Sequence, residues 1–195
     1  MINKIDARGL ACPKPVINTK KELEKIQEGL VRVIVDNKIA KENIIKLSKS
    51  LKYEYEVILE NDNEIQIDIK KGNVIIEEKI ESELSDTCIF INSDKMGKGD
   101  DELGNILMKG YIYSLTETKP YPKTIFMVNS AVTLTTTNEA TIENLSILEK
   151  EGVEIQSCGT CLDFYHLKDN LKVGSVTNMY NIVETMEKSK KVITI

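Results

Sequence analysis

The sequence lacks tryptophan, contains one histidine, and has only two arginines among its 26 basic residues. A single histidine argues against a histidine-rich zinc site and against a Ser-His-Asp triad. The four cysteines are too few to form a disulfide framework for a chain of 195 residues. If the protein performs chemistry, its thiols are therefore the most economical candidates.

Long apolar runs are also absent. No stretch approaches the roughly 18–20 apolar residues of a membrane-spanning helix, and the N-terminus shows no secretory apolar region. We therefore expect no membrane contact and a cytoplasmic location, where free thiols persist. The net charge is +1 over residues 1–80 and −6 over residues 81–195. Neither part has the basic, aromatic surface of a nucleic-acid-binding protein, so we expect no nucleic-acid partner.

The pattern of apolar residues predicts an α/β protein with two unlike domains. With 41% hydrophobic and 29% charged residues, the composition is that of a globular protein long enough for two small domains. Residues 1–70 follow the order β-α-β-α-β-β, which predicts a two-layer sandwich. Residues 71–86 are acidic and lose the pattern, which indicates a linker. In residues 87–195 strands alternate with helices, which predicts a parallel, doubly wound sheet.

The first candidate site is the segment CPKP (12–15), where a loop becomes a helix. Pro13 suits the first helical position, and Cys12 before it is expected to be extended, as a capping residue is. Its sulfur would then lie at the positive end of the helix, near the amides of Lys14 and Val16 and the Lys14 ammonium. A thiol in such a position can have its pKa lowered from about 8.5 to roughly 3.5–7.5. The alternative is a small buried residue at an ordinary helix start.

The wider segment DARGLACPKPVINTKKEL resembles the signature of the TusA/SirA-like sulfur-carrier family. The matching positions are Asp6, Gly9, Leu10, Cys12, Pro13 and Pro15. Four later positions also fit, namely Asp36, Asn37, Ala40 and Asn43, whereas Lys52 stands where a glycine is common. The resemblance covers about residues 1–70 and implies a sandwich whose cysteine carries a persulfide. We expect the Cys12 site to be supported by Asp6, Gly9, Pro13, Lys14 and Pro15.

The second candidate site is the CxxC pair in IQSCGTCLDFY. A strand is expected to end at Cys158 and the next helix to begin at Cys161. The pair could be a redox dithiol, a persulfide acceptor at Cys158 that Cys161 resolves, a metal site, or two partly buried cysteines at a turn. Zinc is the weakest of these because only His166 stands nearby as a third ligand, so we expect no metal. The remaining cysteine, Cys88, lies in an apolar strand and is expected to belong to the core.

The C-terminal half resembles the DsrE/DsrF-like family, whose members have a three-layer α/β/α parallel sheet. In that family the functional cysteine follows a middle strand, as Cys158 does here. The order of the two halves, with MGKGDDELGNILMKGYIYSLTE and SCGTCLDFY, resembles the YedF family of sulfurtransferase-like selenium metabolism proteins. Selenium is implied by this resemblance alone. The resemblance also makes a homo-oligomer plausible.

Together these features predict a sulfur or selenium carrier. Cys12 would hold a persulfide or selenopersulfide and relay it to the Cys158 and Cys161 pair, with no bound cofactor. The expected partners are a cysteine desulfurase or another donor, and a downstream acceptor protein. The main alternative is a non-enzymatic redox switch or partner-binding protein that uses the CxxC pair. A further alternative is a carrier fused to an inert oligomerisation domain. These alternatives differ in whether the protein is a sulfurtransferase-like enzyme.

Overall fold

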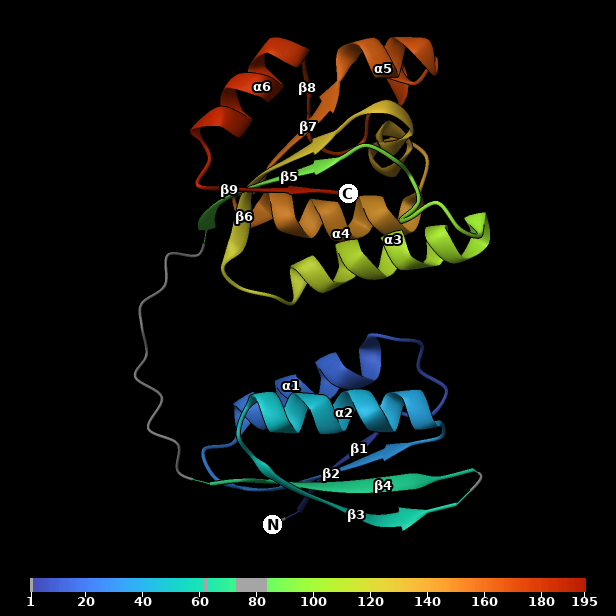
Figure 1. Cartoon of the computed structure of the whole chain (residues 1–195), viewed down its shortest axis with the longest axis vertical. Helices are drawn as coiled ribbons and strands as arrows, with labels where there is room; N and C mark the ends of the chain where they lie inside the picture. The colour runs from blue at the N-terminus through green and yellow to red at the C-terminus, as the bar shows by residue number, and fades with distance from the viewer. Residues whose placement is uncertain (1, 62, 73–83) are drawn as a thin grey trace. The chain divides into compact units, whose positions relative to one another are not determined.

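A computed structural model describes residues 2–61, 63–72 and 84–195 of the chain. The chain divides into two compact units, Met1–Lys79 and Ile80–Ile195 (Figure 1). Both units combine helices with a β-sheet, and each buries its own hydrophobic core. The protein is therefore a mixed α/β protein, as the sequence predicts.

The N-terminal unit is a four-stranded sheet with two helices on one face (Figure 1). Its strands are β1 (Ile2–Asp6), β2 (Gly29–Val35), β3 (Glu54–Glu60) and β4 (Ile65–Lys71). Its helices are α1 (Lys14–Lys25) and α2 (Lys38–Ser50). The sheet order is β1-β2-β4-β3, with β1 parallel to β2 and the other pairs antiparallel. The predicted β-α-β-α-β-β sandwich is confirmed.

Strict alternation of apolar and polar residues produces this two-layer arrangement. The apolar residues of β2 and β4 share one face of the sheet and are buried, namely Val31, Val33, Val35, Ile65, Ile67 and Ile69. They form one core with Leu23 of α1 and Ile44 of α2. On the opposite face Arg32 pairs with Asp68 across the two strands, with Nε to Oδ1 at 2.7 Å. The unit therefore has one apolar and one polar sheet face.

The C-terminal unit is a five-stranded parallel sheet of order β8-β7-β6-β5-β9. Its strands are β5 (Leu84–Ile91), β6 (Tyr121–Met127), β7 (Glu154–Cys158), β8 (Ser175–Thr177) and β9 (Lys191–Thr194). Its helices are α3 (Asp101–Thr116), α4 (Glu139–Lys150), α5 (Gly159–Phe164) and α6 (Met179–Lys188). Two short 3-10 helices are η1 (Asn129–Thr135) and η2 (Lys168–Asn170). The predicted parallel sheet is confirmed, but η1, η2 and β8 were not anticipated.

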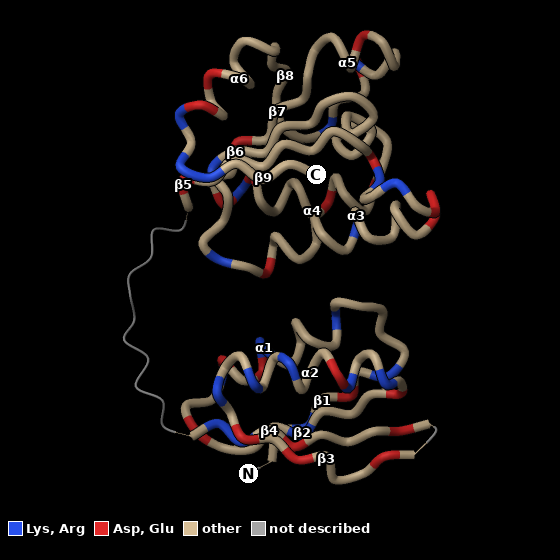
Figure 2. The backbone as a smooth tube through the Cα atoms, in the orientation of Figure 1, with Lys and Arg blue, Asp and Glu red and all other residues tan. Residues whose placement is uncertain are grey.

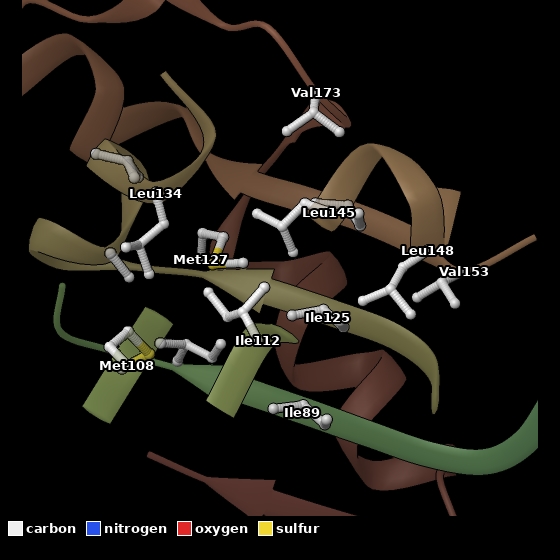
Figure 3. Close-up of a cluster of buried hydrophobic side chains, with 14 of the residues drawn as sticks. Ile89, Met108, Ile112, Ile125, Met127, Leu134, Leu145, Leu148, Val153 and Val173 are labelled. Carbon is white, nitrogen blue, oxygen red and sulfur yellow. The ribbon is translucent and has the colours of Figure 1, made fainter. Parts of the chain in front are cut away.

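Helices cover both faces of this sheet. On one face Ile125 and Met127 pack with Met108 and Ile112 of α3 and with residues of α4, as Figure 3 shows. On the other face Cys88 and Phe126 pack with Ile182 of α6. The unit is thus a three-layer α/β/α sandwich. Burial raises the pKa of the Cys88 thiol to about 11, and the expected core position of this cysteine is confirmed.

Both ends of the expected 71–86 linker belong to strands. Strand β4 continues to Lys71 and β5 begins at Leu84, where the register with β6 pairs Leu84 with Tyr121. Residues 73–83, which include the apolar VII run at 74–76, lie outside the described residues.

Charged residues are absent from the carboxyl-terminal halves of β5, β6 and β7. Figure 2 shows these halves without charge, and their sequences are CIFI, TIFM and IQSC. The last residues of these three strands are therefore uncharged, whereas Asp94, in the loop after β5, accepts a hydrogen bond from Ser130 of η1. Within the described ranges of the chain, no helix is both long and apolar enough to cross a membrane.

Candidate functional site

Cys12 is an exposed free thiol in the turn between β1 and α1. The helix starts one residue later than predicted. Helix α1 begins at Lys14, and its N-cap is Pro13 instead of Cys12. The Cys12–Pro13 peptide bond is cis. The amide of Lys14 donates to the carbonyl of Ala11 (3.0 Å), and that of Val16 donates to the carbonyl of Pro13 (3.1 Å). The prediction that these two amides face the sulfur is wrong, because both close the turn into the helix.

A small hollow of about 40 Å³ lies beside Cys12. One side is formed by the loop and the start of α1, with Leu10, Cys12, Pro13, Pro15 and Val16. The start of α2 forms the other side, with Asn37, Ile39, Ala40 and Asn43. The fold thus brings Cys12, Pro13 and Pro15 next to three residues of the second half of the motif, Asn37, Ala40 and Asn43. A space of this size admits a group on the scale of a water molecule or a sulfur atom.

Two carboxylates hold the loop that leads to Cys12. Arg8 forms a fork with Asp6, with Nε to Oδ1 at 2.9 Å, and this lowers the pKa of Asp6 to about 2. Gly9 has a φ of +70°, which glycine adopts without strain, and its N–H donates to Oδ2 of Asp36 at 2.6 Å. That hydrogen bond lowers the pKa of Asp36. Asp6 and Gly9 therefore shape the loop and do not line the hollow, while Lys14 is exposed to solvent.

The CxxC pair lies where β7 runs directly into α5. Cys158 ends the strand and is the N-cap of the helix, which begins at Gly159. The prediction that the helix begins at Cys161 is therefore wrong by two residues, because no separate turn joins the strand to the helix. Cys158 is buried and Cys161 is half-buried, and both are free thiols.

The two sulfurs of this pair are hydrogen-bonded neighbours. Burial raises the pKa of Cys161, and the hydrogen bond with Cys158 raises it further. The backbone N–H of Asn129, at 3.1 Å from Cys161 Sγ, acts in the opposite direction because it favours the thiolate. The structure therefore places a dithiol at the carboxyl end of the sheet, with Cys161 more protonated than an ordinary thiol.

Asn129 and Tyr165 are site residues that sequence reasoning missed. The hydroxyl of Tyr165 donates to Oδ1 of Asn129 at 2.9 Å. Strands β6 and β7 are parallel neighbours with Met127 opposite Ser157, so the residues after each strand meet at one sheet edge. The signal was available, because Asn129 lies two residues after the end of a buried strand, where ligands and functional groups of such sheets gather.

His166 is an exposed residue with a φ of +56°. The structure does not bring it to Cys158 and Cys161 as a third ligand. Over residues 2–61, 63–72 and 84–195, no three His, Cys, Asp or Glu side chains form a group that could hold a metal ion.

Residues 3–71 match the family model described as sulfurtransferase TusA. A protein of Methanocaldococcus jannaschii, provisionally named a sulfur carrier protein, is 38% identical over 71 residues, which is 36% of this chain and 95% of that relative. A Bacillus subtilis protein with the same kind of name is 40% identical over 47 residues, which is 24% of this chain and 63% of that relative.

Solved structures show two similarities of different extent. The SirA-like protein of Desulfitobacterium hafniense is 38% identical, covers 37% of this chain and 99% of its own, and has a TM-score of 0.35. The ychN protein of E. coli is 17% identical, covers 56% of this chain and 98% of its own, and has a TM-score of 0.45.

Proposed function

The chain belongs, through residues 3–71, to the TusA sulfurtransferase family, and we propose that it is a sulfur carrier whose carrying residue is Cys12. The observation that carries this proposal is the exposed free thiol of Cys12 beside a small hollow lined mostly by apolar residues. Exposure lets a partner's sulfur reach the thiol, and the hollow offers partial shelter to a bound sulfur atom. A thiol chemistry of this kind needs a reducing compartment such as the cytoplasm.

The loading step requires a persulfide donor, and a cysteine desulfurase is the class that we propose. The Cys12 thiolate attacks the outer sulfur of the donor's persulfide. A new S–S bond forms at Cys12 while the donor's S–S bond breaks, and the donor cysteine leaves as a thiolate. No external oxidant or reductant is needed, and no bound cofactor takes part.

The second station of the proposed relay is the CxxC pair. Cys158 takes the outer sulfur from the Cys12 persulfide, and the Cys12 thiolate is released. A downstream acceptor protein can then take the sulfur from Cys158. If none does, the Cys161 thiolate attacks the Cys158 sulfur, which forms a disulfide and releases hydrogen sulfide. An external dithiol reductant then reopens the disulfide. The hydrogen bond between the two thiols supports the disulfide step, because it requires the two sulfurs to lie close together.

The C-terminal unit is proposed to be DsrE/DsrF-like and the whole chain a member of the YedF family. The position of Cys158 at the end of a strand of a parallel sheet supports this assignment. Selenium as an alternative cargo belongs to the same proposal, since a selenopersulfide forms by the same attack. A homo-oligomer of this chain is compatible with the proposed family membership.

Intact-mass spectrometry after incubation with a cysteine desulfurase and cysteine tests the loading step. We expect a gain of one sulfur atom on Cys12, located by peptide mapping, and its loss in Cys12→Ser. Cys158→Ser is the matched control, because it lacks the proposed acceptor of the relay and keeps sulfur on Cys12. Buried Cys88 stays unmodified in all samples, because its thiol is inaccessible and largely protonated. Equal loading of Cys12→Ser and the unaltered protein would overturn the assignment.

The relay is tested separately with protein that has been loaded and freed of donor. In Cys161→Ser we expect the extra sulfur to accumulate on Cys158, whereas Cys158→Ser keeps it on Cys12. Replacing cysteine by selenocysteine as the donor's substrate tests selenium by the same mass shift. A pair that forms a disulfide in redox buffers but never receives sulfur would instead favour the redox switch.

A further inference from the structure

An unused feature of the CxxC site is the backbone amide of Asn129, which points at a sulfur. Its N–H donates to Cys161 Sγ over 3.1 Å. Cys161 is otherwise set among apolar side chains of both cores of the C-terminal unit. Among the described residues, three ionisable groups lie at or near this thiol: Cys158 shares a hydrogen bond with it, Tyr165 bonds to the Asn129 side chain, and the Asp94 carboxylate accepts a hydrogen bond from Ser130, the residue after Asn129. The amide is therefore the polar group that favours a negative charge on Cys161.

We propose that Asn129 and Tyr165 are positioning residues for Cys161. The Tyr165 hydroxyl holds Asn129 in a left-handed backbone conformation, and this conformation keeps the Asn129 N–H on the Cys161 sulfur, where it stabilises the thiolate. The inference rests on the proposed relay, in which Cys161 is the thiol that resolves a persulfide on Cys158.

The backbone of Asn129 explains why a second residue is needed. Its φ is +56°, a region that costs most non-glycine residues free energy and that asparagine tolerates better than others. The 2.9 Å hydrogen bond from Tyr165 adds a tertiary contact that holds the side chain in place. The Tyr165 ring is itself packed edge-on against Phe164, with centroids 5.2 Å apart. Tyr165 thus connects the end of α5 to the start of η1.

The amide acts at the step in which Cys161 forms the disulfide. Only the thiolate of Cys161 attacks the Cys158 sulfur, while the outer sulfur leaves with the bonding electron pair as hydrosulfide. Burial opposes that ionisation, and a backbone N–H aimed at the sulfur offsets part of the cost without adding a charge. Burial thus raises the pKa of Cys161, while the Asn129 amide stabilises the thiolate that reacts.

The experiment measures the pH dependence of Cys161 alkylation by iodoacetamide in the Cys158→Ser background. Peptide mass spectrometry separates this thiol from Cys12 and Cys88. We expect Tyr165→Phe to raise the alkylation midpoint by about half a pH unit. The variant loses a single neutral hydrogen bond, and that bond acts on Cys161 only through Asn129. Asn129→Ala should raise it by about one unit because alanine disfavours the positive φ. The matched control is Tyr180→Phe, an exposed tyrosine on α6, which should leave the midpoint unchanged.

Asn129→Gly separates the backbone from the side chain. Glycine adopts a positive φ without strain, so this variant keeps the amide in place and should shift the midpoint less than Asn129→Ala does. The reaction rate at pH 7 should fall about threefold per unit of pKa, because the thiolate fraction falls while its nucleophilicity rises. Thermal unfolding of each variant reports whether it folds. If Asn129→Ala does not fold, the alkylation midpoint of Tyr165→Phe alone tests the proposal.

Two results would overturn the inference. One is an unchanged midpoint in both Tyr165→Phe and Asn129→Ala, and the other is an equal shift in Asn129→Ala and Asn129→Gly. The readout needs no transferred sulfur, so it is independent of the relay. A shifted midpoint in a protein whose Cys158 never receives sulfur would leave the positioning role standing and refute the proposed relay.

Discussion

The backbone N–H of Gly9 donates a 2.6 Å hydrogen bond to the carboxylate of Asp36. This bond ties the loop that carries Cys12 to the residue that follows β2. Asn37, the next residue, caps α2 through its side chain and also lines the hollow beside Cys12. The two separated halves of the sequence motif therefore meet at one place in the fold.

Removing the Asp36 carboxylate should impair sulfur loading. In Asp36→Ala the Gly9 amide loses its acceptor, so we expect the loop to sample other conformations and Cys12 to load roughly three- to tenfold more slowly. Asp36→Asn keeps a side-chain oxygen and should retain most of the rate. The measurement is the time course of the mass gain with a desulfurase, with Asp169→Ala, at an exposed position of η2, as control. An unchanged rate in Asp36→Ala would refute this role of the hydrogen bond.

The ion pair between Asp6 and Arg8 should make stability depend on acid pH. The Asp6 pKa falls from its ordinary value of 3.8 to about 2 in the folded protein, because Arg8 bonds to the carboxylate. A lowered carboxyl pKa stabilises the fold fully above about pH 4, and that contribution is lost as the pH falls from about 4 to 2. At pH 6 the unaltered protein should therefore melt at a higher temperature than Asp6→Asn. The two melting temperatures should converge near pH 2.

High salt should shrink the same difference, because both groups of this pair are accessible to solvent. A gap between the two melting curves that persists at pH 2 would show that the loss comes from packing and not from charge.

Lys52 should be replaceable by glycine with a gain in stability. It follows α2 with a φ of +57°, in the left-handed conformation that glycine prefers at helix ends. We expect Lys52→Gly to raise the free energy of unfolding by about 0.5–1 kcal/mol, after the entropy cost of glycine is included. Lys52→Ala removes the ammonium but keeps the Cβ, so it should bring no gain. Urea unfolding measures both, and equal effects would point to charge as the cause.

Gly159 should resist substitution although it begins a helix. Alanine usually stabilises a helix relative to glycine, but here its Cβ would lie 3.1 Å from Cγ1 of Val176 and 3.4 Å from the carbonyl oxygen of Thr177. We expect Gly159→Ala to lower the free energy of unfolding by about 1 kcal/mol. Adding Val176→Ala should restore most of it, since Val176 is half-exposed and its removal alone costs little. Additive effects of the two substitutions would exclude this crowding.

Local pattern was sufficient to predict most of the fold. Alternation in β2 and β4 and the helical spacing of α1 and α2 are set by neighbouring residues, and they led to the correct order of elements in the N-terminal unit. The short strand β8 and the 3-10 helix η1 were missed. Ser175–Thr177 is too short to show a period, and the residues of η1 are ordered by packing, since Thr135 bonds to Ser157 across the core.

The cysteine sites show where local reasoning stops. Proline chemistry correctly placed Cys12 at a helix start, but it misjudged the cap by one residue and the direction of two amides. Those amides donate to carbonyl groups of their own turn and not to the sulfur. A short motif does not reveal which of several nearby acceptors an amide will bond to. For the CxxC pair, the spacing of Cys158 and Cys161 correctly predicted that they are neighbours. It did not predict that α5 begins at Gly159.

The sequence by itself determined that the protein is α/β and that Cys88 belongs to the core, and it selected the other thiols as the candidate reactive groups. These conclusions depend on composition, periodicity and spacing, which act over a few residues. Only the tertiary structure decided which groups surround each thiol, namely the Asp36 anchor of the Cys12 loop and the Asn129 amide at Cys161. Such contacts join residues far apart in the chain, and the packing of whole strands and helices, not local propensity, brings them within hydrogen-bond distance.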